Sequence, residues 1–303
     1  MTLSQKSRAA LVVAHPSHEL RIHRWLEQTR PRVCILTDGA GRSGEPRLHR
    51  TTEVLFRTGA TPGPIYGRLT DLEIYAAILN QDSKLFAGIV EELAQMFVDD
   101  QIEYVAGDAA EGYSVTHDIC RVMIDAAVEL AQARYGHPVA NFDFPVVGSP
   151  DSCPLALRHK AIRLELDDLA FTRKLNEALS YSPKLAHDVE AALAGAPFQG
   201  DVEVSKSVHA ALEGRPTLKA RLRDIIEGVP LDAFRVECLR PVANPLGSPW
   251  TSDEPLFYEL YGEKLVAAGR YKEVIRCRKH MLPLAAAIQA EVEREEHCVR
   301  SAS

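Results

Sequence analysis

The chain has 303 residues, of which 46% are hydrophobic and 25% are charged, as in an ordinary globular protein. Its 35 Lys and Arg against 42 Asp and Glu give a net charge of −7 at pH 7, which argues against general nucleic-acid binding because that needs a basic surface. No apolar run approaches about 18 residues, so we expect no membrane span. The six cysteines are scattered without a CxxC pair, which indicates reduced thiols in a cytoplasmic protein.

Short apolar runs alternate with helical patterns over the first half of the chain. The runs that are typical of buried parallel strands lie at residues 10–14, 33–37, 65–66 and 102–106, and at 139–142 or 146–147. Between them, apolar residues recur near helical spacing at 20–28, 48–57, 72–99 and 117–133. Strands that alternate with helices predict an α/β fold, with a parallel sheet flanked by helices.

The pattern changes near residues 149–151. Strand-like runs largely vanish beyond that point, and helical patterns prevail at 155–193, 256–268 and 271–293. We therefore predict an α/β domain over residues 1–149 and a mainly helical C-terminal region over residues 150–303. That region could serve as a lid, as a dimer surface of a homo-oligomer, or as a subdomain for substrate specificity.

Three histidines follow two of the predicted strands. His15 and His18 come directly after residues 10–14, and His117 follows the strand at 102–106 and opens the next helix. Ligands of open parallel sheets bind outside the carboxyl ends of the strands. Three imidazoles with an open position suit a catalytic zinc or another divalent metal, which polarises a carbonyl and activates a water molecule. The same spacing also fits surface or helix-capping histidines.

Three short motifs occur in a defined order along the first half of the chain. They are Val-Val-Ala-His15-Pro16-x-x-Glu19, Leu36-Thr37-Asp38-Gly39, and a helix that begins at His117. This order resembles the LmbE/PIG-L deacetylases over about residues 10–135. The resemblance implies a Rossmann-like fold and zinc-dependent removal of acetyl groups from N-acetylated amino sugars or related amines. It also places His15, His18 and His117 at the positions of the family's zinc ligands.

The chain departs from the family pattern at three positions. The family's general base is the first Asp of its Ala-His-Pro-Asp-Asp-Glu motif and is Ser17 here, whose hydroxyl cannot take up a proton near neutral pH. The second Asp is His18, still a good zinc ligand, and the first His of the family's second motif is Ser114. We expect Glu111 or Asp108, in a glycine-flanked loop, to replace the base. Both acids equally suit capping of the helix that follows.

A glycine motif follows the second predicted strand. The segment Gly39-Ala40-Gly41-Arg42-Ser43-Gly44 fits the GxGxxG fingerprint of dinucleotide-binding proteins. A fingerprint belongs to the first turn between strand and helix, whereas this motif follows the second strand, so a flexible loop at the rim of the site is favoured. Within that rim we expect Arg42 to bind an anionic substrate group. Tyr113 is expected either to donate a hydrogen bond to an oxyanion or to form a wall.

Together these patterns predict a metal-dependent hydrolase of a C–N amide bond. The favoured reaction is N-deacetylation of an N-acetylated amino sugar or a related small metabolite, with zinc or another divalent metal as cofactor. A small-molecule substrate is the expected partner, without nucleic acid or membrane. Two alternatives remain open, namely a non-catalytic metal- or sugar-binding member of the same fold, suggested by Ser17, and a nicotinamide-dependent oxidoreductase that uses the glycine loop.

Overall fold

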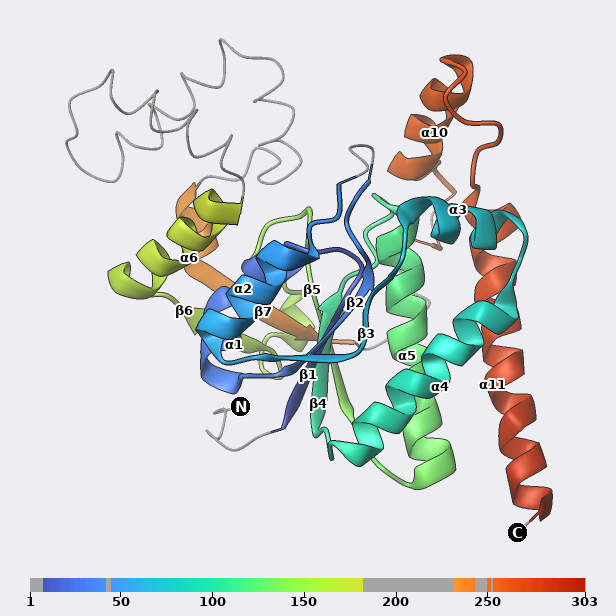
Figure 1. Ribbon diagram of the computed structural model, residues 1–303, viewed down its shortest axis with the longest axis horizontal. Helices are drawn as coiled ribbons and strands as arrows, with labels where there is room; N and C mark the ends of the chain where they lie inside the picture. Colours follow the sequence, from blue (N-terminus) through green and yellow to red (C-terminus); the bar gives the residue numbers. More distant parts are fainter. Residues whose placement is uncertain (1–7, 42–44, 182–230, 243–249, 252, 303) are drawn as a thin grey trace.

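The computed structural model describes residues 8–41, 45–181, 231–242, 250–251 and 253–302. Within these residues seven strands form one sheet in the order β3-β2-β1-β4-β5-β7-β6 (Figure 1). The strands are β1 (Ala9–Val13), β2 (Arg32–Thr37), β3 (Thr61–Leu69), β4 (Tyr104–Asp108), β5 (Ala140–Phe144), β6 (Ile162–Glu165) and β7 (Val236–Pro241).

The first five strands form a doubly wound parallel sheet. β1 pairs in parallel with β2 on one side and with β4 on the other, and β3 and β5 extend the sheet in parallel beyond them. The strand order therefore reverses between β1 and β4, which is the point where ligands of such sheets bind. This arrangement confirms the predicted α/β fold class with a Rossmann-like sheet flanked by helices.

Helices cover both faces of the sheet. The longer ones are α1 (His23–Thr29), α2 (Leu48–Thr58), α3 (Asp71–Leu79), α4 (Ser83–Asp99), α5 (Val115–Tyr135), α6 (Asp168–Tyr181), α10 (Phe257–Ala267) and α11 (Leu282–Ala302), and the 3-10 helix η1 (His18–Ile22) follows β1. Figure 1 shows α4, α5 and α11 on one side of the sheet, and α1, α2 and α6 on the other.

Residues of β1 alternate between two hydrophobic cores. Ala10 and Val12 pack with apolar residues of α4, α5 and α11, whereas Leu11 and Val13 pack with Trp25 and with apolar residues of α1 and α2. All five residues of β1 are buried. A strand that is buried on both faces reads as a continuous apolar run rather than as an alternating one, which is why β1 was predictable.

The sequence analysis missed β6 and β7. β7 pairs antiparallel with β5, through Phe142 and Pro241 and through Asp143 and Arg240, and β6 pairs antiparallel with β7. The C-terminal region expected to be mainly helical therefore also extends the sheet of residues 1–149, and it adds α11 to one core. The predicted boundary between the two regions stays a prediction.

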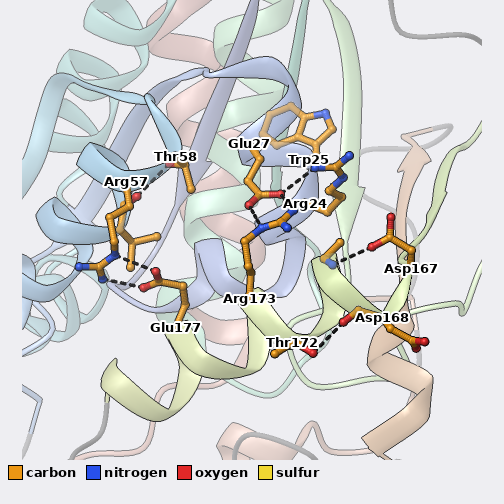
Figure 2. Close-up of polar contacts among 12 residues, drawn as sticks. Arg24, Trp25, Glu27, Arg57, Thr58, Asp167, Asp168, Thr172, Arg173 and Glu177 are labelled. Carbon is orange, nitrogen blue, oxygen red and sulfur yellow. Dashed lines mark hydrogen bonds and ion pairs between the residues drawn. The ribbon is translucent and has the colours of Figure 1, made fainter.

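Arginine–glutamate ion pairs join α6 to α1 and α2 (Figure 2). Arg173 Nε donates to Glu27 Oε1 over 2.6 Å, and Arg57 Nη2 donates to Glu177 Oε2 over 2.6 Å. Burial alone would raise the pKa of Glu27, but the hydrogen bonds from Arg173 and Arg24 outweigh it and hold this pKa at about 2. Charged hydrogen bonds thus help to attach a helix of the C-terminal region to the first part of the chain.

We expect Glu27→Gln to lower the free energy of unfolding by about 1–2 kcal/mol at pH 7, because it removes the charge that pairs with Arg24 and Arg173. The loss is not larger, since both arginines are partly exposed and water screens part of the attraction. A carboxyl pKa below its ordinary 4.5 stabilises the fold above that pH and loses this effect as the pH falls toward 2. Urea unfolding at pH 7, 5 and 3 should show the deficit shrinking to less than half at pH 3.

The matched control is Glu92→Gln, which removes an exposed partner of Arg68. This change should cost less than about 0.5 kcal/mol at each pH. A deficit in Glu27→Gln that is equal at pH 7 and pH 3 would contradict the role given to the ion pairs.

Candidate active site

The loop between β1 and η1, which carries two of the three predicted histidines, makes a sharp turn. Ser17 lies in the left-handed region with φ 91°, and its backbone N–H donates to Glu19 Oε2 over 2.8 Å. Thr51 donates to the other oxygen of this buried carboxylate over 2.8 Å. Gly39 lies against the loop, because a Cβ there would be 2.7 Å from Pro16 Cδ. The turn is therefore fixed by a buried acid and by a close backbone approach.

The structure brings the three predicted histidine rings together. Their centroids are 5.2 Å apart for His15 and His18, 5.1 Å for His15 and His117, and 4.6 Å for His18 and His117. His15 and His18 follow β1, and His117 lies in the first turn of α5, which follows β4. The histidine cluster, as we call these three residues, thus lies where the strand order reverses.

The tautomers of two rings follow from their partners. His18 Nδ1 donates to Asp108 Oδ2 over 2.8 Å, since this carboxylate is ionised and can only accept. His15 Nδ1 lies 2.8 Å from Thr37 Oγ1, whose own hydroxyl donates to the carbonyl of Ala14 over 3.2 Å. Thr37 therefore accepts from His15. A neutral ring with this contact has its lone pair on Nε2, and metal-ligating histidines are oriented in the same way.

Burial favours the neutral form of two rings of the cluster, His15 and His117. Burial, followed by the charge that His18 carries when it is protonated, lowers the pKa of His117 to about 3, although the charge of Asp108 acts in the opposite direction. Burial, followed by His117 and His18, also holds the pKa of His15 well below its ordinary value. Burial alone would raise the pKa of Asp108, but the charge and hydrogen bond of His18 outweigh it and lower this pKa. Neutral imidazole is the form that binds metals.

One nitrogen of the cluster lacks a protein partner. His117 Nδ1 is buried and accepts or donates no hydrogen bond within the described part of the chain. A buried polar atom without a partner costs roughly 1–3 kcal/mol and requires an explanation, for which an ion is one candidate. The donor chemistry of the three rings therefore fits a divalent metal.

The three histidines do not form a complete metal-ligand set in this conformation. Among the residues with described positions, no group of three or more His, Cys, Asp or Glu side chains could hold a metal ion as it stands. Binding of zinc or another divalent metal by His15, His18 and His117 accordingly stays a prediction.

The two acids that were predicted as bases have structural partners. Asp108 is fully buried, and its Oδ2 also accepts the backbone N–H of Ala14 over 2.8 Å. Both oxygens of Glu111 accept backbone N–H groups of residues 146–148, over 2.8 to 2.9 Å. These contacts orient His18 and anchor a loop, and they favour neither acid as a base. The catalytic role of Asp108 and Glu111 stays a prediction without further support.

A carboxylate that the sequence analysis missed faces the cluster. Asp71 Oδ1 lies 3.4 Å from His15 Nδ1, and 27% of its side chain is exposed. Burial raises the pKa of Asp71, while the charge of Arg47 acts in the opposite direction. The sequence signal was Thr70-x-x-Glu73, whose capping box begins α3 at this residue. The capping box predicts where α3 starts. It does not predict which strand of the sheet ends next to that helix start.

Of the predicted substrate contacts, one lies beside the cluster. The ring centroid of Tyr113 is 6.3 Å from that of His117, with the planes inclined by 36°. Arg42, with the rest of the glycine motif at 42–44, lies outside the described residues. Arg47, at the end of the same loop, donates from Nε to the carbonyl of Gly39 over 2.7 Å.

Comparisons with known proteins give a distant structural likeness. The chain is similar to a crystal structure of the antimicrobial reagent A40926 pseudoaglycone deacetylase Dbv21, with 20% sequence identity over 78% of this chain and 97% of that chain and a TM-score of 0.43. No protein-family model matches the chain, and no curated protein matches it.

The left-handed backbone at Ser17 predicts a stabilising substitution. Glycine adopts positive φ without the clash of a Cβ, so Ser17→Gly should raise the free energy of unfolding by about 0.5–1 kcal/mol. Ser17→Ala is the matched control, because it removes the same hydroxyl but keeps the Cβ, and it should give no gain. Urea unfolding of the three proteins measures the difference, and equal stabilities of the Gly and Ala variants would contradict the strain.

Proposed function

We propose that this protein is a metal-dependent hydrolase of an amide C–N bond and that His15, His18 and His117 hold the metal, with zinc as the first candidate. The observation that carries the proposal is the convergence of three rings from two separate loops at the switch point of the sheet. Two of these rings have fixed tautomers, and the third has a buried nitrogen without a partner. The resemblance to the LmbE/PIG-L deacetylases favours an N-acetylated amino sugar as substrate.

Two residues of the chain prepare the cluster for a metal. Asp108 and Thr37 accept the Nδ1 protons of His18 and His15, which leaves Nε2 of each ring as the nitrogen that would bind the metal. When bound, a divalent metal polarises the amide carbonyl and activates a water molecule for attack. The deep burial of Asp108 strengthens its hydrogen bond to the ring, because few water molecules compete for it.

Asp71 is the acid that we assign to proton transfer. Its carboxylate is partly exposed and lies 3.4 Å from Nδ1 of His15, whereas Asp108 is fully buried and Glu111 is occupied by three backbone N–H groups. A base must reach the proton that it removes. Asp71 Oδ1 would take a proton from the attacking water and return it to the leaving amine. Glu111 and Asp108 remain the alternatives.

A location in the cytoplasm is part of the proposal. No helix in the described segments is long and apolar enough to cross a membrane. Among the residues with described side chains, the free, buried cysteines are Cys34, Cys120, Cys153, Cys238 and Cys277. Free thiols are typical of proteins in reducing compartments.

Metal content and amine release test the proposal together. Purified protein that has been incubated with zinc and then dialysed should retain about one metal ion per chain, as a three-histidine site would. It should also release free amine from N-acetylglucosamine. His117→Ala should lose the metal and reduce amine release to background, because the remaining two rings cannot hold the ion. Elemental analysis and a fluorescent amine assay measure the two quantities.

The matched control is His49→Ala on α2, because His49 is exposed and lies outside the cluster. It should keep both metal and activity. Wild-type protein that retains no zinc, cobalt or manganese, or a His117→Ala variant with unchanged metal content, would overturn the metal site.

A second comparison tests the assignment of the base. Asp71→Asn should reduce kcat by about 100-fold, as expected for the loss of a general base, and should leave the metal content unchanged. Glu111→Gln should reduce kcat by less than tenfold, because its backbone contacts tolerate an amide in part. The opposite order of the two losses would return the role to Glu111.

A non-catalytic binding protein is the second candidate. The observation that favours it is Ser17, at the position of the family's base. Such a protein would bind zinc and N-acetylglucosamine in calorimetry without releasing amine, and Asp71→Asn would leave that binding unchanged. Any amine release that His117→Ala abolishes would exclude this candidate.

A further inference from the structure

Aromatic side chains lead away from the histidine cluster toward solvent. The ring centroid of Tyr113 lies 4.6 Å from that of Phe257, with the planes inclined by 9°, and Phe257 lies 5.9 Å from Tyr261, with the planes inclined by 10°. The inner end of this stack adjoins His117, whose ring centroid is 6.3 Å from that of Tyr113. We call Tyr113, Phe257 and Tyr261 the aromatic row.

The helix that carries most of the row is attached to the rim of the site. Phe257 and Tyr261 are four residues apart on α10 and therefore share a face. Tyr258, on another face of the helix, is buried, and its backbone N–H donates to the carbonyl of Gly112 over 3.3 Å. Farther along, Glu259 Oε1 accepts the N–H of Cys277 over 2.7 Å. Figure 1 shows α10 at the end of the molecule where α5 begins.

The outer part of the row is exposed to solvent. Phe257 is 49% exposed and Tyr261 is 37% exposed, and Leu260 beside them is 46% exposed. Single exposed apolar residues are common, but a group of large ones on one helix indicates a binding surface. Because the row is continuous with His117, its occupant is expected to be a molecule that also reaches the cluster, rather than a separate protein.

We propose that the aromatic row binds an apolar group that the substrate carries next to the hydrolysed amide. The choice of an amide rests on the proposed function. The row would then select amino-sugar amides with an aromatic or long-chain substituent over those that carry only an acetyl group. An apolar substituent removed from water by three aromatic side chains should improve affinity by about tenfold or more.

Calorimetry with three glycosides tests this selectivity in the full-length protein. The probes are methyl N-acetylglucosaminide, 4-methylumbelliferyl N-acetylglucosaminide with an aromatic aglycone, and methyl N-octanoylglucosaminide with a long acyl chain. At least one of the two substituted probes should bind about tenfold more tightly than the first. The probe that does so shows whether the apolar group belongs to the aglycone or to the acyl chain.

Substitutions on α10 tie the preference to the row. In Phe257→Ser and Tyr261→Ser the affinities for the preferred probe and for the methyl N-acetyl probe should come within about twofold of each other, because the apolar area is lost. Phe257→Leu should retain most of the preference for an acyl chain. Phe56→Ser on α2 is the control, since Phe56 is even more exposed and lies outside the row. It should keep the full preference.

Equal affinities for the three probes, no binding of either substituted probe, or a preference that survives Phe257→Ser and Tyr261→Ser would overturn the inference. So would light scattering that shows a dimer which Phe257→Ser dissociates, because the row would then be covered by a second copy. Amine release is measured separately. A preference for an apolar probe without amine release would support the aromatic row and contradict the proposed hydrolase. Amine release without such a preference would support the hydrolase and contradict the role of the row.

Discussion

One buried carboxylate oxygen connects the sheet to the histidine cluster. Asp108, the last residue of β4, accepts with Oδ2 both the backbone N–H of Ala14, just after β1, and Nδ1 of His18. The bond to Ala14 joins the ends of the two strands at the point where the strand order reverses. The bond to His18 fixes the orientation of a ring beside His117. A shift of β4 relative to β1 would therefore disturb the fold and the cluster together.

The loop between β4 and α5 is held in place from two directions. The Glu111 side chain accepts the backbone N–H groups that follow β5, while Asp118 Oδ1 accepts the N–H groups of Glu111 and Gly112. Burial raises the pKa of Asp118 to about 7, despite the hydrogen bond that Trp250 donates to it. Tyr113 follows this anchored segment. The glycine-flanked loop that was expected to supply a base is thus held by its own acids in a position that places the ring of Tyr113 beside His117.

The sequence was informative where side chains act through burial and regular spacing. β1 is a continuous apolar run, and the positions of His15, His18 and His117 after strand ends were enough to predict that their rings meet. β6 was missed because it has only four residues. β7 lies more than 70 residues farther along the chain, and the antiparallel pairing of the two strands breaks the alternation of parallel strands and helices. Strand β6, with the sequence Ile-Arg-Leu-Glu, does alternate apolar and charged residues, which is the signal of a strand with one covered face.

The acids of the site were harder to predict because their partners are mostly backbone groups. The contacts of Glu111 depend on how the loop after β5 turns. The residue types in that loop do not indicate that three consecutive backbone N–H groups are available to one carboxylate. Asp71 looked like an ordinary residue in the first turn of a helix, where acids are common. Its position beside His15 follows only when β3 lies next to β2, and β2 next to β1, so that α3 begins at the same edge of the sheet as the cluster.

The C-terminal region packs against the α/β part of the chain, and in the proposed function it contributes to the site. It extends the sheet through β7, covers one core with α11, and brings α10 to the rim through the contact between Tyr258 and Gly112. The residues proposed for chemistry all precede residue 149, whereas two members of the aromatic row follow it. In the proposed function, chemistry and substrate selection would therefore depend on separate parts of the chain. Changes in α10 could then alter the choice of substrate while the contacts of Asp108 and the histidine cluster stay the same.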